Sequence, residues 1–128
     1  MKKILLIDDE KDFTELTGTF LSYYSLQVDT INDPVQVDER IQMIQYDAVV
    51  TDLMMPSIDG FELIRRLRSF QNYLETPIIA LTAKVLSDNE RKFLLQNGVR
   101  LMTKPFEPQA LVKQITELLT EKSKTPSQ

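Results

Sequence analysis

The chain has 128 residues, of which 42% are hydrophobic, and it contains neither cysteine nor histidine. This length predicts a single domain whose hydrophobic core needs no disulfide or structural metal. The missing residue types exclude thiol chemistry, cysteine zinc sites and histidine general bases. A net charge of −4 with scattered basic residues disfavours direct nucleic-acid binding. Because no apolar run is long enough for a signal-peptide core or a membrane span, we expect a cytoplasmic protein.

Five short apolar runs alternate along the chain with five stretches of helical spacing. The predicted strands are Lys3–Ile7, Leu26–Ile31, Asp47–Thr51, Ile78–Thr82 and Val99–Thr103. The first, third and fourth contain consecutive apolar residues, which is typical of strands covered on both faces. We therefore expect these three strands at the centre of a sheet.

The predicted helices carry an apolar stripe at helical spacing. The stripes are Phe13, Leu16, Phe20 and Tyr24 in the first helix, Val37, Ile41 and Ile44 in the second, Leu63, Leu67 and Phe70 in the third, and Leu111, Ile115, Leu118 and Leu119 in the fifth. The fourth stripe is less regular, but Ser87 and Glu90 form a capping-box pattern, and Gly98 suits the left-handed residue that ends a helix. Pro34 and Pro108 are typical of first helical turns.

Strict alternation of strands and helices predicts parallel strands joined by right-handed crossovers, with helices on both faces of the sheet. This is a doubly wound α/β fold, which we expect to occupy residues 1–122. The polar segment 123–128 is expected to form a tail or the start of a linker.

Polar side chains follow the predicted strands, at the edge where open parallel sheets bind ligands. Asp8 and Asp9 follow the first strand, Asp52 follows the third, Thr82 ends the fourth and Lys104 follows the fifth. If the strand order is 2-1-3-4-5, the three carboxylates share one crevice between strands one and three. At about 5 Å they repel by roughly 3 kcal/mol per pair at an effective dielectric constant near 20. Protonation or a divalent cation would offset this repulsion, and oxygen ligands without histidine or cysteine favour Mg²⁺.

Each of these residues alone has an ordinary structural explanation, such as an acid beside a helix N-terminus or a solvated lysine. Together they are typical of a phosphoryl site, where charge is neutralised from several sides. Since serine and threonine lack a histidine base here, a carboxylate is the best nucleophile, and Asp52 is the best candidate. The three glycines form neither a phosphate loop nor a dinucleotide motif, so the phosphoryl group is expected from a donor other than a bound nucleotide.

At these residues the sequence resembles the receiver domain of bacterial two-component response regulators. The matching segments, which have the order and spacing of the family, are Ile4–Glu10, Asp52–Gly60, Ala80–Ala83 and Thr103–Phe106. The resemblance implies a flavodoxin-like (βα)5 fold with strand order 2-1-3-4-5. It also implies a signalling switch that accepts a phosphoryl group on Asp52 from the phosphohistidine of a histidine kinase or phosphotransfer protein, and then hydrolyses it slowly.

The resemblance implies roles for the acidic residues and their neighbours. Asp9, Asp52 and the backbone carbonyl of Met54 would hold Mg²⁺, with Asp8 helping mainly through water. Met54 and Lys84 would tune the lifetime of the aspartyl phosphate.

The resemblance implies further roles at the ends of the fourth and fifth strands. The Lys104 ammonium, the Thr82 hydroxyl and the Ala83 backbone N–H would bind the phosphoryl oxygens. The Lys104–Pro105 peptide would be cis, a geometry that the small cis penalty of proline allows.

One position departs from the common pattern of the family. Many receivers carry tyrosine or phenylalanine three residues before the lysine, and this ring moves inward when the threonine engages the phosphoryl group. The residue here is Leu101, which is smaller and cannot hydrogen-bond. We therefore expect an altered or weak phosphorylation signal on the face formed by the fourth helix, fifth strand and fifth helix.

Two other functions stay open. A pseudo-receiver would dock to partners without taking phosphate, and a haloacid-dehalogenase-like phosphatase would also use an aspartate and Mg²⁺. That phosphatase family places D-x-D after its first strand, whereas Asp8 and Asp9 are adjacent here. The switch would act on an effector protein or on an output domain missing from this chain, as an adaptor, a phosphorelay intermediate or part of a longer regulator. A dimer that forms on phosphorylation is also left open.

Overall fold

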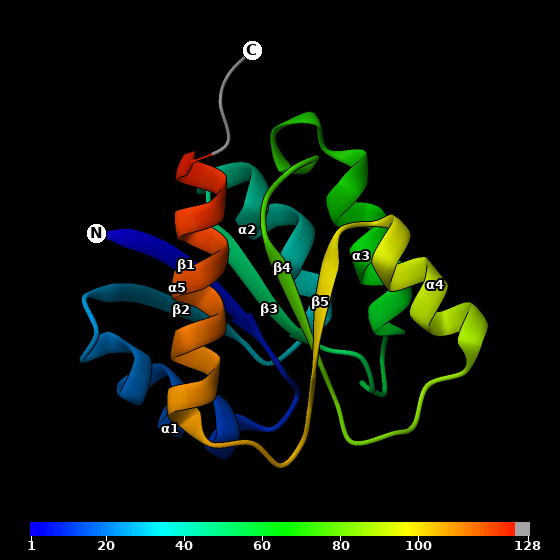
Figure 1. Cartoon of the computed structure of the whole chain (residues 1–128), viewed down its shortest axis with the longest axis horizontal. Coiled ribbons are helices and arrows are strands. Elements are labelled where there is room, and N and C mark those ends of the chain that lie inside the picture. Colours follow the sequence, from blue (N-terminus) through cyan, green and yellow to red (C-terminus); the bar gives the residue numbers. More distant parts are fainter. Residues whose placement is uncertain (125–128) are drawn as a thin grey trace.

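The computed structural model describes residues 1–124, with side chains described through Glu121. Strands and helices alternate along the chain (Figure 1). In chain order they are β1 (Lys2–Ile7), α1 (Lys11–Ser22), β2 (Leu26–Ile31), the 3-10 turn η1 (Pro34–Gln36), α2 (Val37–Met43), β3 (Ala48–Asp52), α3 (Gly60–Ser69), the 3-10 turn η2 (Gln71–Tyr73), β4 (Ile78–Thr82), α4 (Asp88–Gln96), β5 (Val99–Thr103) and α5 (Pro108–Lys124). All five predicted strands are present, with their bounds shifted by at most one residue.

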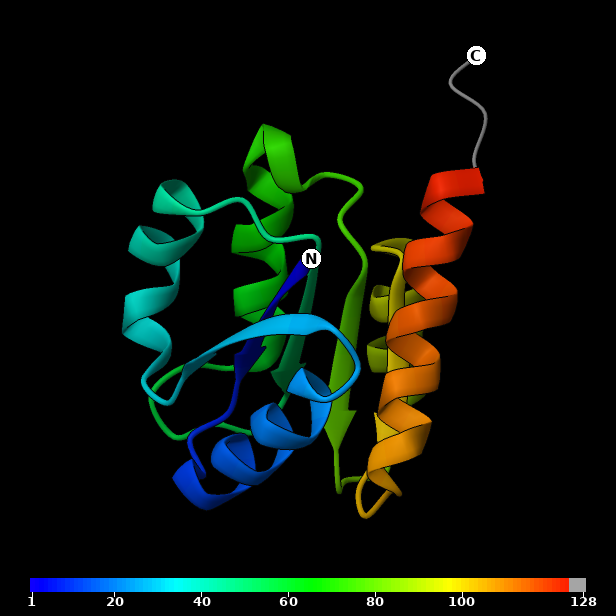
Figure 2. The same cartoon turned by 90° about the vertical axis from the view of Figure 1, so that its left-hand side faces the viewer.

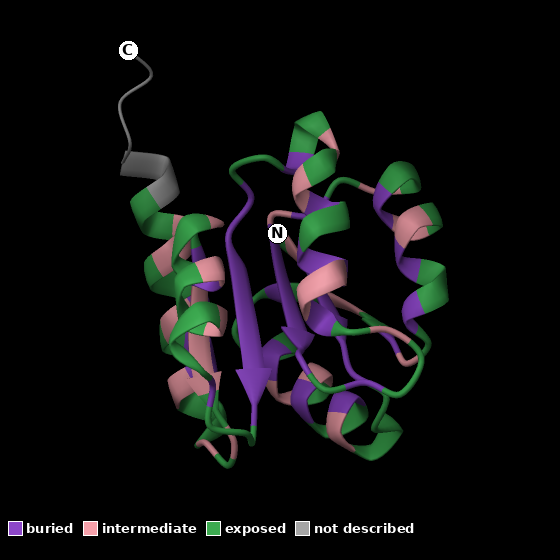
Figure 3. Ribbon diagram, turned by 90° about the vertical axis from the view of Figure 1, so that its right-hand side faces the viewer, coloured by how far each residue is buried: buried purple, intermediate pink, exposed green. Residues whose placement is uncertain are grey.

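The five strands form one parallel sheet of order β2-β1-β3-β4-β5, as predicted. The central strands β1, β3 and β4 are the buried ones, and Figure 3 shows them between half-exposed helices. Helices α1 and α5 cover one face and α2, α3 and α4 the other. Figure 2 shows α2 and α3 on the side of the sheet opposite α5. Alternate side chains of one strand enter opposite cores: Leu5 packs with the α2–α4 side and Leu6 with the α1–α5 side. All parallel strands end at one edge, where the polar residues are found.

The predicted helix boundaries are largely confirmed. Ser87 and Glu90 form a complete capping box at the start of α4, and Gly98 has a φ of 65° just beyond its end. Pro108 is the first residue of α5. Pro34 begins the short turn η1, which Asp33 caps, and α2 starts only at Val37.

The apolar stripe predicted for the first helix is wrong at two positions. Leu16 is 75% exposed and Tyr24, which lies beyond the end of α1, is 48% exposed. The buried positions of α1 are Thr14, Thr17 and Leu21. Thr14 can be buried because its hydroxyl donates to the Lys11 carbonyl, and hydrophobicity alone does not indicate this.

The C-terminal boundary also differs from the prediction. Helix α5 continues to Lys124, two residues into the segment predicted as a tail, and residues 125–128 of that segment lie outside the described part of the chain. Among the described residues, no helix has the length and apolar character needed to cross a membrane.

Candidate functional site

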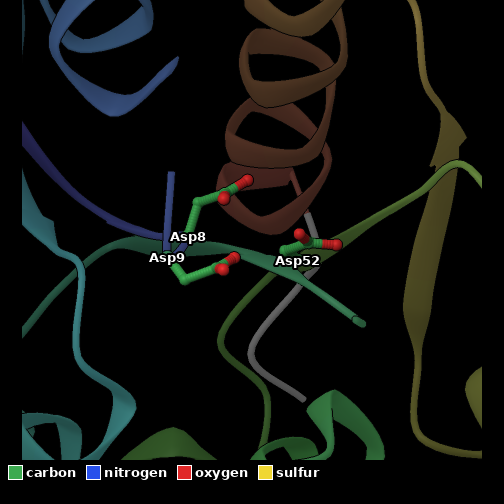
Figure 4. A group of neighbouring side chains, drawn as sticks. All are labelled: Asp8, Asp9 and Asp52. Carbon is green, nitrogen blue, oxygen red and sulfur yellow. The ribbon is translucent and has the colours of Figure 1, made fainter. Parts of the chain in front are cut away.

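Three carboxylates meet where β1 and β3 end. Residues Ile7 and Thr51 are paired on these neighbouring strands, so the residues that follow them lie side by side. Asp8, Asp9 and Asp52 each place a carboxylate oxygen within 4.8 Å of the other two (Figure 4). Asp8 and Asp52 are buried, whereas Asp9 is exposed. The predicted acidic crevice is therefore present in the fold.

Lys104 joins this cluster from the end of β5. Its Nζ lies 2.9 Å from Asp8 Oδ2, 3.5 Å from Asp52 Oδ2 and 3.8 Å from Glu10 Oε1. The peptide bond to Pro105 is cis, and the Lys104 backbone N–H donates to the carbonyl of Thr82 at 2.8 Å. Both residues were predicted at this edge, but nothing in the sequence indicated that Lys104 bonds directly to Asp8.

The buried charges perturb one another. Burial raises the pKa of the Asp52 carboxyl, and the negative charge of Asp8 raises it further, against the Met54 N–H and the Lys104 ammonium, which lower it. For Lys104, burial lowers the pKa of the ammonium, but the hydrogen bond and charge of Asp8, followed by the charges of Asp52 and Glu10, raise it above its usual value. Lys104 therefore stays charged at neutral pH and offsets part of the repulsion between the carboxylates.

The segment after β3 is folded tightly over Asp52. The Met54 N–H donates to Asp52 Oδ1 at 3.1 Å, Met54 pairs with Asp59, and the Gly60 N–H donates to the Leu53 carbonyl at 3.1 Å. A Cβ on Gly60 would lie 2.5 Å from the Leu53 Cα, closer than real contacts allow. Only glycine fits at this position, where α3 begins against the end of β3.

The remaining predicted residues lie at or near the same edge. Thr82 is buried at the end of β4, and its hydroxyl oxygen accepts the Lys84 backbone N–H at 3.0 Å. Ala83 is exposed and shares a cavity of about 380 Å³ with Lys104 and Pro105. Leu101 is the exception, because it lies within β5, paired with Ala80 and packed against the α2–α4 core.

Sequence reasoning missed a second layer of residues around Asp8. The Asn32 amide donates to the Asp8 carbonyl at 2.8 Å and to Thr14 Oγ1 at 2.9 Å, and the Glu10 N–H donates to Asp8 Oδ1 at 2.9 Å. The Phe13 ring lies 4.4 Å from the Lys104 ammonium. The position of Asn32 directly after β2 was an available signal, since it is another polar residue at the carboxyl end of a strand.

The donor set suits a hard divalent cation. Asp8, Asp9 and Asp52 offer only carboxylate oxygens, and the chain has no histidine or cysteine to attract a softer metal. A larger cavity, of about 660 Å³, opens beside these residues between the segment 53–59, Asp9 and the side chains of Lys84 and Glu90. It is large enough to admit a phosphoryl group and water beside the end of β3.

Comparison with known proteins identifies the arrangement. Residues 4–116 match the family described as the response regulator receiver domain. This chain belongs to that family. Over 98% of its length it is 30% identical to the response regulator SaeR of Staphylococcus epidermidis, and over 93% it is 38% identical to the hybrid signal transduction histidine kinase D of Dictyostelium discoideum. The chain covers 53% of the SaeR relative and 8% of the kinase, so it corresponds to a part of each.

Solved receiver structures have the same fold. The chemotaxis protein CheY4 of Vibrio cholerae superposes with a TM-score of 0.85 at 27% identity, covering 92% of this chain and 98% of CheY4. The receiver domain of Francisella response regulator 1452 gives a TM-score of 0.84 at 29% identity, covering 95% and 99% of the two chains. This receiver domain therefore has the flavodoxin-like fold of such regulators. It belongs to a family of phosphorelay signalling domains.

Proposed function

We propose that this receiver domain is a phosphorylation-dependent switch with Asp52 as the phosphoryl acceptor. The observation that supports this most strongly is the meeting of Asp8, Asp9, Asp52 and Lys104 at one sheet edge, from strands far apart in sequence. The Asp52 carboxylate is buried and contacts Lys104, and the segment that follows it directly, Leu53–Asp59, lines the open cavity. The donor is a phosphohistidine on a histidine kinase or a phosphotransfer protein.

The transfer needs few protein groups. An Asp52 oxygen attacks the phosphorus and the P–N bond of the phosphohistidine breaks. The bonding electron pair stays on the ring nitrogen, and the imidazole leaves as a neutral group because its other nitrogen carries a proton. Lys104, the Thr82 hydroxyl and the Ala83 backbone N–H bind the phosphoryl oxygens, whose charge must be stabilised during the transfer. Hydrolysis follows slowly, when water attacks the phosphorus, inorganic phosphate leaves and the Asp52 carboxylate is restored.

A divalent cation belongs to this proposal. Asp9, Asp52 and the Met54 carbonyl would hold Mg²⁺, with Asp8 helping mainly through water, and the ion would neutralise charge on the phosphoryl oxygens when bound. Lys104 pairs with Asp8 and Asp52, whereas the exposed residue Asp9 lines the cavity.

The output is proposed to use the face formed by α4, β5 and α5. Its recipient is an effector protein or an output domain joined to this chain, and a dimer through this face is part of the same proposal. Thr82 would begin the switch by turning toward the phosphoryl group. With Leu101 in place of an aromatic ring, the signal on this face is expected to be weak or altered. We expect the protein to work in the cytoplasm.

Two observations bear on the alternatives. A pseudo-receiver does not need the complete set of Asp8, Asp9, Asp52, Thr82 and Lys104 at one edge, yet all five are present. A haloacid-dehalogenase-like phosphatase places its nucleophile after the first strand. The proposed acceptor here, Asp52, instead ends β3, where it contacts Lys104. A turnover assay with small phosphate monoesters is expected to show almost no activity.

Intact-mass spectrometry after incubation with acetyl phosphate and Mg²⁺ tests the proposal. We expect the mass of one phosphoryl group to be added to the unmodified chain. No addition is expected for Asp52→Asn or for a sample with chelator. Lack of addition to the unmodified chain, also with a phosphohistidine donor, would favour the pseudo-receiver, and addition to Asp52→Asn would place the acceptor elsewhere.

A further inference from the structure

Lys84 and Glu90 form an ion pair at the mouth of the larger cavity. Lys84 Nζ lies 3.3 Å from Glu90 Oε2, and both side chains line the cavity that Asp9 and Met54 also line. The Lys84 backbone is held by its hydrogen bond to the Thr82 hydroxyl, so its side chain starts beside the phosphoryl-binding residues. The Lys84 side chain is 49% exposed, which leaves it room to move.

Glu90 also belongs to the N-terminal cap of α4. Its Oε1 accepts the Ser87 backbone N–H at 2.8 Å, while Ser87 Oγ accepts the Glu90 N–H at 3.2 Å. The hydrogen bond from Ser87 and the neighbouring Lys84 ammonium hold the pKa of the Glu90 carboxyl below its usual value. Glu90 is therefore charged at neutral pH and holds Lys84 toward α4.

We propose that Glu90 and the phosphoryl group on Asp52 compete for the Lys84 ammonium, and that Glu90 thereby shortens the lifetime of the aspartyl phosphate. This inference rests on the proposed function. Glu90 is a positioning residue, because it acts through Lys84. Phosphorylation places a strongly negative group beside the cavity that Lys84 lines, which attracts the ammonium away from Glu90.

The expected direction follows from the path of the attacking water. Water must approach the phosphorus opposite the bond to Asp52, from the open side of the site. A lysine side chain that enters the cavity to pair with the phosphoryl oxygens occupies this path, so hydrolysis slows. While Glu90 holds Lys84, the path stays open.

Glu90→Gln separates the ion pair from the helix cap. Glutamine at this position still completes a capping box, so the variant loses the charge and keeps the cap. Each chain is phosphorylated with acetyl phosphate and Mg²⁺, the donor is removed, and the loss of phosphoryl mass is followed over time. We expect Glu90→Gln to slow this loss about two- to fivefold, as the strength of an exposed ion pair allows.

Two further variants distinguish this mechanism from a change in α4. In a Lys84→Gln background, Glu90→Gln is expected to have no effect, because no ammonium is left to release. Ser87→Ala weakens the cap but keeps both charges of the Lys84–Glu90 pair, and it is expected to leave the lifetime unchanged.

An unchanged or shortened lifetime in Glu90→Gln would overturn the inference, as would an equal effect in the Lys84→Gln background or a similar effect of Ser87→Ala. These results would leave the proposed function standing, since the chain would still take the phosphoryl group. If the wild-type chain takes none, the proposed function and the inference both fail.

Discussion

Replacing Asp52 with asparagine removes one charge from a crowded cluster and is expected to stabilise the unliganded chain. Carboxylates with oxygens within 4.8 Å repel by about 3 kcal/mol per pair at an effective dielectric constant near 20, whereas Lys104 at 3.5 Å attracts Asp52 by about 5 kcal/mol. Asp8 is buried, so it repels Asp52 with nearly its full strength, whereas solvent partly screens the repulsion from exposed Asp9. Repulsion and burial outweigh the single ammonium, so Asp52→Asn should raise the free energy of unfolding by about 1–2 kcal/mol at neutral pH.

The size of this stabilisation depends on pH in a defined direction. Burial and the charge of Asp8 raise the pKa of Asp52 in the folded chain. A carboxyl with a raised pKa favours the folded state below its unfolded pKa, and this contribution is lost as the pH rises through the folded value. The advantage of Asp52→Asn should therefore grow as the pH rises through the raised pKa of Asp52, and vanish at lower pH, where the wild-type carboxyl is neutral.

Urea unfolding followed by circular dichroism, from about pH 4 to about pH 7 with a chelator present, measures this difference. Glu75→Gln is the matched control, because Glu75 is an exposed carboxylate before β4, at the opposite end of the strands. We expect it to change the free energy of unfolding by less than about 0.5 kcal/mol. A variant Asp52→Asn that is no more stable than wild type at neutral pH, or whose advantage does not change with pH, would refute the electrostatic reasoning.

Three more substitutions test other parts of the structure. Gly60→Ala should lower the free energy of unfolding in urea by about 3 kcal/mol, because its Cβ would lie 2.5 Å from the backbone of the segment after β3. Gly18→Ala is the control and should lower it by nothing, because its Cβ meets only side chains, at 3.5 Å or more. Equal losses of stability in the two variants would contradict the clash at Gly60. Arg68→Met should cost about 2–4 kcal/mol, because three backbone carbonyls lose a half-buried guanidinium donor, and a loss under about 0.5 kcal/mol would argue against this role. Leu101→Tyr should enlarge the amide shift changes over 99–119 when beryllium fluoride and Mg²⁺ bind, and large changes there already in wild type would contradict a weak signal.

Much of the fold is local in origin and was therefore predictable from the sequence. The apolar runs of β1, β3 and β4 indicated central strands, and each became a buried strand. The capping pattern of Ser87 and Glu90 involves neighbouring residues, so it appeared as expected. Five site residues were predictable because parallel strands end at one edge of the sheet, so residues that directly follow different strands lie close together.

Contacts between distant residues were decided only by the tertiary structure. No local pattern indicates that Lys104 bonds directly to Asp8, that Asn32 supports the Asp8 backbone, or that Arg68 binds the carbonyl of Asn97. The same holds for Thr14, which is buried in place of the more hydrophobic Leu16, because its hydroxyl has hydrogen-bond partners in the fold. A hydrophobic pattern reports the average environment of a residue type, whereas burial of a polar group depends on partners that only the packed chain brings within reach.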